Sequence, residues 1–283
     1  MRLVTISDIH IDVGENRAWL DRLCGQSHSD EIIIVAGDIA SKLERIGDGL
    51  KQLAESYAGV FFVPGNHDLW VEPSSGSNSL QRFEELLSLC AECGVETQST
   101  ILKNENGDRA VAILPMFTWY AGPESGPGSL FLPKEGEDAS LGMWVDRIRI
   151  RWPESMDCPV DYFLSLNQPA EAERDGIPAV SMSHFLPRQE LIFSTAHERE
   201  RYAGKGFDRA PRFNFSRVAG SYEIDRQLRE WGVQTHIYGH QHRNRDRVID
   251  GVRYLSHCLG YPQERAMVGV RAEDIEPLEV LTF

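Results

Sequence analysis

Short apolar runs alternate with amphipathic stretches along the first third of the chain. The apolar runs are rich in β-branched residues and have the length of buried strands, and the stretches between them repeat apolar residues at helical spacing. The predicted strands are 3–6, 32–36 and 60–63, and the predicted helices are 15–25, 42–57 and 78–93. Strands joined by crossovers of this length pair in parallel, as right-handed βαβ units. Because ligands bind beyond the carboxyl ends of such strands, polar residues there are expected to meet.

The same pattern continues in the second half of the chain. It predicts strands at 110–114, 179–182 and 235–238, and a helix that Ser221 caps, with Ile224, Leu228 and Trp231 on one face. Short runs in the tail are interpreted as antiparallel strands that complete a second sheet, at 252–256, 267–270 and 278–282. No repeat or linker divides the chain, so a single α/β domain over 1–283 is expected.

Residues 116–178 break this regularity. Aromatic residues are interleaved with Gly and Pro, and the periodicity is poor. We interpret the segment as an insertion packed over the rim of a site, a candidate lid, with a short helix near 161–166 or 168–175. An insertion without a functional role is the alternative. Residues 188–219 are polar and rich in arginine and are interpreted as a second surface excursion.

Composition narrows the range of partners. The formal charge is −14, from 29 basic and 43 acidic residues, so long nucleic acid is an unlikely partner and a broad footprint for anionic membrane is not expected. No stretch approaches the roughly 18 apolar residues of a membrane span. The chain begins directly with a predicted strand, which leaves no room for a signal peptide, and a cytoplasmic location is expected. Cys90 and Cys93 lie inside a helical pattern and are predicted to be core thiols.

Polar clusters follow the apolar strands. In chain order they contain Asp8, His10, Asp38, Asn66, His67, Asp68, His184, His240 and His242. One such histidine is more often structural than a ligand, but the whole series in this order indicates a site. Carboxylate and imidazole together suit Mn, Fe, Zn, Co or Ni better than Ca or Mg. There are too many groups for one ion, and they fit two divalent cations that share a carboxylate and activate water for attack on a phosphoester. A single-metal oxygenase would leave half of the cluster unexplained.

This motif series resembles the calcineurin-like metallophosphoesterase superfamily, over most of the chain outside 116–178 and 188–219. The resemblance implies a four-layer αββα sandwich of two mixed sheets and two divalent transition-metal ions, with Mn expected to support activity in vitro. It implies that Asp8, His10 and His242 hold the first ion, that Asn66, His184 and His240 hold the second, and that Asp38 bridges both. A metal-bridging hydroxide would be the nucleophile. His67 would then protonate the leaving alkoxide, and Asp68 would orient His67 or support the ligands.

Two departures from the superfamily's protein phosphatases favour its phosphodiesterase-like branches. The glycine that usually follows the first motif is absent, and Gly37-Asp38 is not followed by an Asp-Arg pair. Arg188 and Arg243 are candidates to replace the missing arginine, with ordinary surface arginines as the alternative. We expect hydrolysis of a small phosphodiester or phosphomonoester, with the diester preferred. A nucleotidase, a nuclease and a non-catalytic scaffold are the alternatives, and the complete set of site residues disfavours the scaffold.

Overall fold

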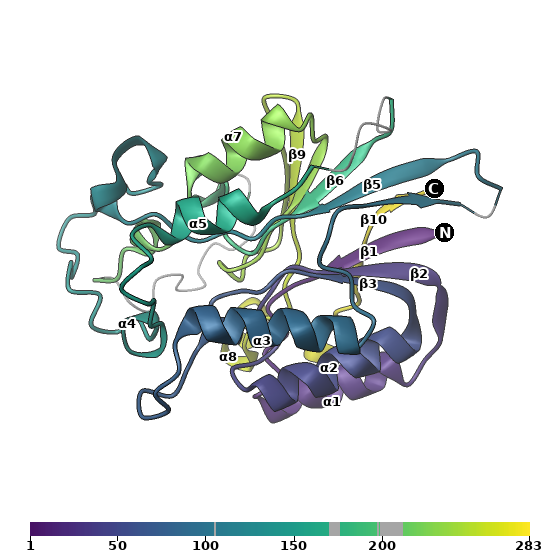
Figure 1. Cartoon of the computed structure of the whole chain (residues 1–283), viewed down its shortest axis with the longest axis horizontal. Coiled ribbons are helices and arrows are strands. Elements are labelled where there is room, and N and C mark those ends of the chain that lie inside the picture. Colours follow the sequence, from purple (N-terminus) through teal and green to yellow (C-terminus); the bar gives the residue numbers. More distant parts are fainter. Residues whose placement is uncertain (105, 170–175, 197, 199–211) are drawn as a thin grey trace.

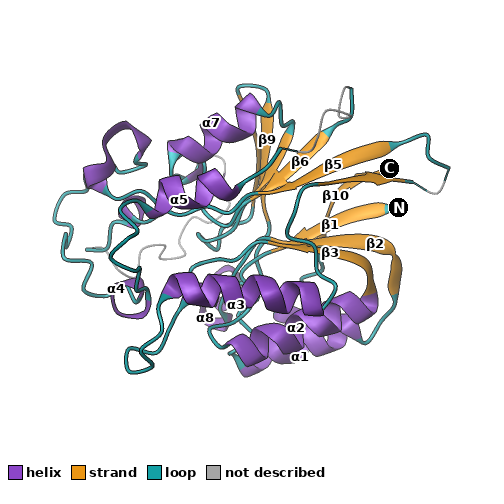
Figure 2. Ribbon diagram, in the orientation of Figure 1, coloured by secondary structure: helices purple, strands orange, loops and turns teal. Residues whose placement is uncertain are grey.

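Two β-sheets lie between two layers of helices in the computed structural model (Figures 1 and 2). The structure describes residues 1–104, 106–169, 176–196, 198 and 212–283. Both sheets are mixed, with parallel and antiparallel neighbours. The predicted four-layer αββα arrangement is therefore confirmed.

The first sheet has the strand order β10-β1-β2-β3. Its strands are β1 (Arg2–Ile6), β2 (His28–Val35), β3 (Tyr57–Phe62) and β10 (Leu278–Thr282). The helices α1 (Gly14–Cys24), α2 (Leu43–Ser56) and α3 (Ser79–Glu92) lie in the layer beside this sheet (Figure 1). The first three strands are parallel, as the βαβ pattern predicts. The Cys90 thiol is buried in the core, and neither Cys90 nor Cys93 forms a disulfide.

The second sheet has the order β4-β5-β6-β7-β9-β8. Its strands are β4 (Thr100–Lys103), β5 (Ala110–Pro115), β6 (Ala179–Met182), β7 (Thr235–Ile237), β8 (Arg245–Ile249) and β9 (Val252–Ser256). Helices α5 (Pro159–Leu166) and α7 (Tyr222–Glu230) lie beside it, in the layer opposite α1 to α3 (Figure 2). The Ser221 side chain accepts a hydrogen bond from the Glu223 amide at the start of α7, as its position predicts.

The tail differs from its predicted arrangement. Strand β10 pairs antiparallel with β1, so it extends the first sheet and not the second. The predicted strand at 267–270 is wrong, because these residues end helix α8 (Pro262–Val268), which Gly269 terminates in a left-handed conformation at φ 72°. A short apolar run is ambiguous between helix and strand, and here proline at the helix start favours the helix. The sequence pattern also missed β4 and β8, which are short strands at the two edges of their sheet.

Much of the insertion 116–178 is packed structure. The rings of Trp119, Trp152 and Phe163 contact one another, and Phe163 meets Phe83 of α3 edge to face, with centroids 5.1 Å apart. The insertion also contains the short helix α4 (Asp146–Arg149). Its helix α5 matches the first of the two predicted helix positions, and most of the second lies outside the described residues. Part of the predicted excursion 188–219 lies outside them as well. No helix in the described ranges has the length and apolar character needed to cross a membrane.

Candidate metal centre

The polar clusters meet beyond the carboxyl ends of five parallel strands. Three belong to the first sheet and two, β6 and β7, belong to the second, so both sheets supply side chains to one place. Asp8 and His10 follow β1, Asp38 follows β2, Asn66 and His67 follow β3, His184 follows β6, and His240 and His242 follow β7.

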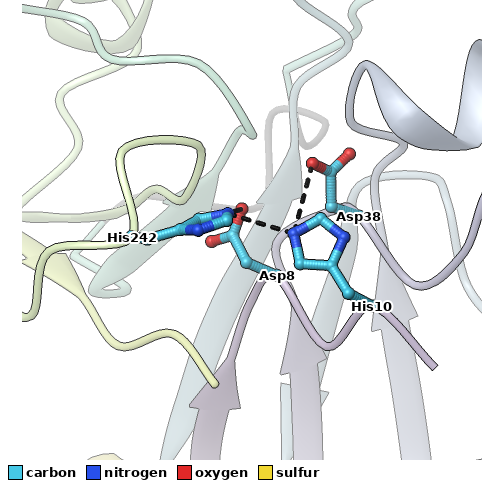
Figure 3. Close-up of side chains that lie close together, drawn as sticks. All are labelled: Asp8, His10, Asp38 and His242. Atoms are coloured by element: carbon cyan, nitrogen blue, oxygen red, sulfur yellow. Dashed lines mark hydrogen bonds and ion pairs between the residues drawn. The ribbon is translucent and has the colours of Figure 1, made fainter. Parts of the chain in front are cut away.

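One group of potential ligands contains Asp8, His10, Asp38 and His242, which converge in Figure 3. One ligand atom from each lies within 4.8 Å of all the others. The His10 Nε2 and His242 Nε2 atoms are 3.0 Å apart, and His242 Nε2 is 3.3 Å from Asp8 Oδ1. His10 Nε2 is 3.9 Å from Asp38 Oδ2. The set can surround a single cation with two carboxylates and two imidazoles.

A second group adjoins the first and shares Asp38 with it. His184 Nε2 lies 3.4 Å from Asp38 Oδ2 and 3.2 Å from Asn66 Oδ1. His240 Nδ1 lies 3.2 Å from the same His184 nitrogen. Asp38 Oδ2 therefore lies near His10 of the first group and His184 of the second, which is the position of a bridging ligand.

The donor set fits divalent cations. Asp8 and Asp38 are 0% and 1% exposed, and neither carboxylate pairs with a lysine or arginine in the part of the chain that the structure describes. Two buried carboxylates are costly unless opposite charge compensates them. Bound cations would supply that charge, and the converging imidazole nitrogens would complete their coordination.

Hydrogen bonds on the outer side of the histidines hold their rings. His184 Nδ1 lies 2.9 Å from the Ala36 carbonyl oxygen, and His240 Nε2 lies 2.9 Å from the Val218 carbonyl oxygen. Each of these nitrogens must donate its hydrogen to the carbonyl, so the other nitrogen of the ring keeps its lone pair for a metal. His242 Nδ1 is likewise 2.6 Å from Glu264 Oε2.

Asp146 holds the amide of Asn66 in the same way. Asn66 Nδ2 donates to Asp146 Oδ1 at 2.9 Å, and Trp70 Nε1 donates to the same oxygen at 2.7 Å. The Tyr120 hydroxyl donates to Asp146 Oδ2 at 3.2 Å. Because an ionised carboxylate only accepts hydrogen bonds, it draws the Asn66 NH₂ toward itself and leaves Oδ1 facing His184. Asp146 and Glu264 were not identified from the sequence, since neither belongs to a motif.

The backbone turns sharply where it presents the ligands. Seven described non-glycine residues have positive φ, and five of them are candidate ligands. These five are Asp8 (51°), His10 (46°), Asp38 (60°), His240 (72°) and His242 (52°). Such conformations are costly for residues other than glycine and cluster at functional sites. The left-handed turns aim successive side chains into one small volume.

Two glycines allow the ligands to pack against the main chain. A Cβ at Gly65 would lie 2.2 Å from Asp38 Oδ1 and 2.7 Å from His184 Nε2. A Cβ at Gly37 would lie 2.4 Å from His184 Nδ1, and Gly37 also has φ +86°. Both glycines of the sequence motifs are therefore required by the close approach of ligand side chains.

Burial and neighbouring charge set the protonation states of the metal-free site. Burial lowers the pKa of His10, His184 and His240, so these rings are neutral and able to bind a metal. Burial would lower the pKa of His242 too, but Asp8 and Glu264 outweigh it and hold this pKa well above the usual value. Without a metal, His242 therefore carries the proton that a cation would displace.

His67 lies beside the metal-binding groups and faces a hollow of about 220 Å³. Its ring stacks on Trp70 with centroids 3.7 Å apart, and its Nε2 is 4.0 Å from Asp38 Oδ2. Burial and the positive charge of His242 lower the pKa of His67 to about 3, so the ring is neutral in the metal-free protein. The same hollow, called the metal hollow below, is also lined by Trp144 and Tyr261.

Asp68 binds the loops that carry the ligands. Its carboxylate accepts hydrogen bonds from the backbone amides of Asp38, Ile39, Ala40 and Gly65, at 2.7 to 3.2 Å. These bonds tie the loop after β2 to the loop after β3. Of the two predicted roles of Asp68, this geometry corresponds to support of the ligand loops.

The two candidate arginines, Arg188 and Arg243, have different surroundings. Arg188 pairs with Asp225 at 3.2 Å and with Asp250 at 3.0 Å, and these partners occupy its guanidinium outside the metal-binding groups. The prediction that Arg188 acts at the site therefore finds no support in its position. Arg243 follows His242 and lines a second hollow beside the metal centre.

An αββα sandwich with these metal-binding groups at its strand ends defines a metal-dependent phosphoesterase. The chain belongs to the calcineurin-like phosphoesterase family, whose model matches residues 1–244. It is 27% identical, over 93% of its length and 78% of the relative, to the [acyl-carrier-protein] phosphodiesterase PptH of Mycobacterium tuberculosis. The crystal structure of phosphopantetheinyl hydrolase PptH from that organism matches at a TM-score of 0.70, with 23% identity over 100% of this chain and 96% of that one. A putative 5′-nucleotidase from Staphylococcus aureus matches at 0.41, with 12% identity over 90% of this chain and 48% of its own. The family, the fold and the phosphoester-hydrolase class predicted from the motifs are confirmed.

Proposed function

We propose that this protein hydrolyses a phosphodiester at a centre of two divalent cations. The proposed ligands are Asp8, His10 and His242 for one cation, Asn66, His184 and His240 for the other, and Asp38 for both. The observation that carries the proposal is the position of Asp38 Oδ2, 3.9 Å from His10 Nε2 and 3.4 Å from His184 Nε2. A carboxylate between two sets of ligands is what a pair of cations requires.

When bound, the two cations would supply a nucleophilic hydroxide and neutralise charge on the phosphate. His67 is the candidate general acid, since its imidazole is partly exposed in the metal hollow and is not needed as a ligand. A phosphate anion beside the ring would raise the pKa of His67 from its low value in the metal-free protein. The bound substrate would in this way provide the charge that lets His67 hold a proton for the leaving oxygen.

We propose that the diester is attached to a carrier protein, as the name of the relative PptH suggests. Three large apolar residues within 143–148 of the insertion are exposed: Met143 at 60%, Val145 at 43% and Ile148 at 61%. They alternate with Trp144, which lines the metal hollow, and with Asp146, which holds Asn66. Exposed apolar side chains in a segment that reaches a site favour contact with a macromolecule over a small phosphoester alone.

The described part of the insertion 116–178 is proposed to form a fixed cover at the rim of the site, within a single domain over 1–283. Trp144 and Asp146 place this segment at the metal centre, and its Leu130 and Val160 join the core. Deleting the segment is therefore expected to unfold the protein. Chemical unfolding of a variant lacking 121–160 tests this, and a stably folded product would show that the segment is dispensable.

Elemental analysis and turnover of defined esters test the proposed function together. Two cations per chain are expected after loading with Mn²⁺. The protein is expected to hydrolyse bis-p-nitrophenyl phosphate faster than p-nitrophenyl phosphate, and to release phosphopantetheine from a holo-carrier protein. Faster monoester turnover would redirect the assignment to a phosphomonoesterase or nucleotidase. A protein that holds metal but hydrolyses none of the three substrates would refute the proposal.

For the carrier protein, charge placed on the exposed apolar surface provides the test. Ile148→Glu is expected to raise KM for the holo-carrier protein and to leave turnover of bis-p-nitrophenyl phosphate unchanged. Val248→Glu is the matched control, because Val248 is 72% exposed on β8 and lies outside the insertion. Equal KM values for Ile148→Glu and the wild type would argue against docking at this surface.

A further inference from the structure

A second hollow of about 280 Å³ lies beside the metal hollow. Its lining runs from Arg243, Asn244 and Arg245 to the region of helix α8. His242 and Glu264 line both hollows, so the two hollows adjoin at this pair. A molecule with its phosphorus at the metal ligands could therefore extend into the second hollow past a single pair of side chains.

Three charged side chains of the second hollow have partners of opposite charge. Arg245 lies 3.6 Å from Glu198, Asp246 lies 2.8 Å from Arg253, and Arg265 lies 2.5 Å from Glu15. An occupant bearing a full charge would have to compete with these pairs. These charge pairs thus favour an uncharged occupant over a second phosphate or an ammonium group.

Part of the lining of the hollow is apolar. It is formed by Leu259, Val268, Val270 and Ile275. Polar groups, including the Asn244 side chain, also line the hollow. Ligand pockets commonly combine an apolar lining with a few polar groups in this way. Each hollow alone is smaller than the roughly 300 Å³ at which ligand pockets begin, and an arm and a phosphate in the two adjoining hollows would together occupy a volume in that range.

We propose that the second hollow binds the uncharged, partly apolar organic arm of the diester while the phosphate occupies the metal hollow. This inference rests on the proposed function and specifies which part of the substrate the protein selects. A pantetheinyl arm, with amide groups and methyl groups but no charge, has this chemistry. Glu264 holds the boundary at which the hollows adjoin, because its Oε2 contacts His242 Nδ1 and also accepts a hydrogen bond from the Tyr261 amide at 2.9 Å.

Two esters with the same leaving group test the proposal. One is the p-nitrophenyl ester of phosphopantetheine, and the other is methyl p-nitrophenyl phosphate, which has no arm. Val268→Trp and Val270→Trp each place an indole in the second hollow. Each is expected to lower kcat/KM for the pantetheinyl ester by about tenfold or more and to leave the methyl ester unchanged. Val248→Trp is the control for a new exposed tryptophan, since Val248 does not line the hollow.

The outcomes separate this inference from the proposed function. An unchanged kcat/KM for the pantetheinyl ester in both variants would overturn the arm site. So would an equal loss on both esters, because that loss would come from damage to the metal centre. A wild-type protein that hydrolyses neither ester would instead refute the proposed function itself. Val270 is 37% exposed, so Val270→Trp keeps the test available should Val268→Trp fail to fold.

Discussion

Replacing Asp146 with alanine is expected to weaken the second cation site, although Asp146 is not a proposed ligand. The carboxylate is 2% exposed and accepts hydrogen bonds from Asn66, Trp70 and Tyr120. In Asp146→Ala the Asn66 amide loses the acceptor that distinguishes its nitrogen from its oxygen. The amide can then rotate and present NH₂ to the cation in place of Oδ1, which repels the metal.

The size of the effect follows from the three hydrogen bonds. Each buried donor left without an acceptor costs about 1–3 kcal/mol, and water admitted from the metal hollow will recover part of this. We expect the free energy of unfolding to fall by about 2–4 kcal/mol. Loss of a group that orients a metal ligand typically lowers metal affinity by about 10- to 100-fold, and we expect this for the second Mn²⁺.

The variant Asp146→Asn distinguishes the effect of orienting the Asn66 amide from the effect of the negative charge of Asp146. The asparagine Oδ1 can accept from Asn66 and Trp70, and its NH₂ can donate to the Tyr120 hydroxyl, which turns to accept. This variant is therefore expected to keep most of the affinity for the second cation. Asp157→Ala is the matched control, because Asp157 is an exposed aspartate of the same insertion.

Calorimetric titration of chelator-stripped protein with Mn²⁺ measures the two affinities, and elemental analysis gives the stoichiometry. Chemical unfolding measures the stability independently. Wild-type affinity for the second Mn²⁺ in a destabilised Asp146→Ala would show that Asp146 serves only the fold. An affinity in Asp146→Asn as low as in Asp146→Ala would show that the negative charge matters and not the orientation of Asn66.

Four further predictions follow from the structure. Asp38→Ala is expected to abolish binding of both cations and turnover together; two Mn²⁺ per chain by elemental analysis would contradict the bridging position. Gly65→Ala places a methyl group against Asp38 and is expected to lower Mn²⁺ stoichiometry in a folded protein, whereas normal stoichiometry and rate would show that the loop adapts. His67→Ala should retain both cations and lose most rate on diesters with high-pKa leaving groups; an equal loss on p-nitrophenyl esters would exclude its role as acid. Burial lowers the pKa of His236 from 6.5 to about 3. Between these two pH values the His236 side chain is protonated in the unfolded chain and neutral in the folded protein. Its contribution to stability is present above pH 6.5 and falls by about 1.4 kcal/mol per pH unit as the pH drops toward 3. His236→Asn should therefore show a shallower pH dependence in chemical unfolding of metal-free protein, and an identical slope would refute this account.

The proposed ligands could be identified before the structure because each follows a strand closely. A ligand such as Asp38 is placed by the run of apolar residues before it and by the adjacent glycine, and both are local features. Parallel pairing then brings the strand ends to one edge whatever the details of packing. The helices of the first sheet were predictable for the same reason, since their apolar periodicity is contained within each segment.

Residues whose roles depend on distant partners could not be found in this way. Asp146 lies in an aperiodic segment, and only folding brings it to Asn66, 80 residues away in the sequence. Glu264 resembles an ordinary helix-capping residue until its carboxylate is seen against His242. Arg188 follows His184 closely in sequence, yet its position is set by acidic partners from other elements.

The chain therefore encodes the class of chemistry locally, in short polar motifs that end apolar strands. It encodes the support and the selectivity of the site through long-range contacts. Strand β10 shows the same division, because its apolar pattern predicts a strand but cannot choose between two sheets. Its pairing with β1 depends on the free sheet edge that the completed fold offers. The hollow that α8 and its neighbours form beside the metal centre likewise exists only in the completed fold.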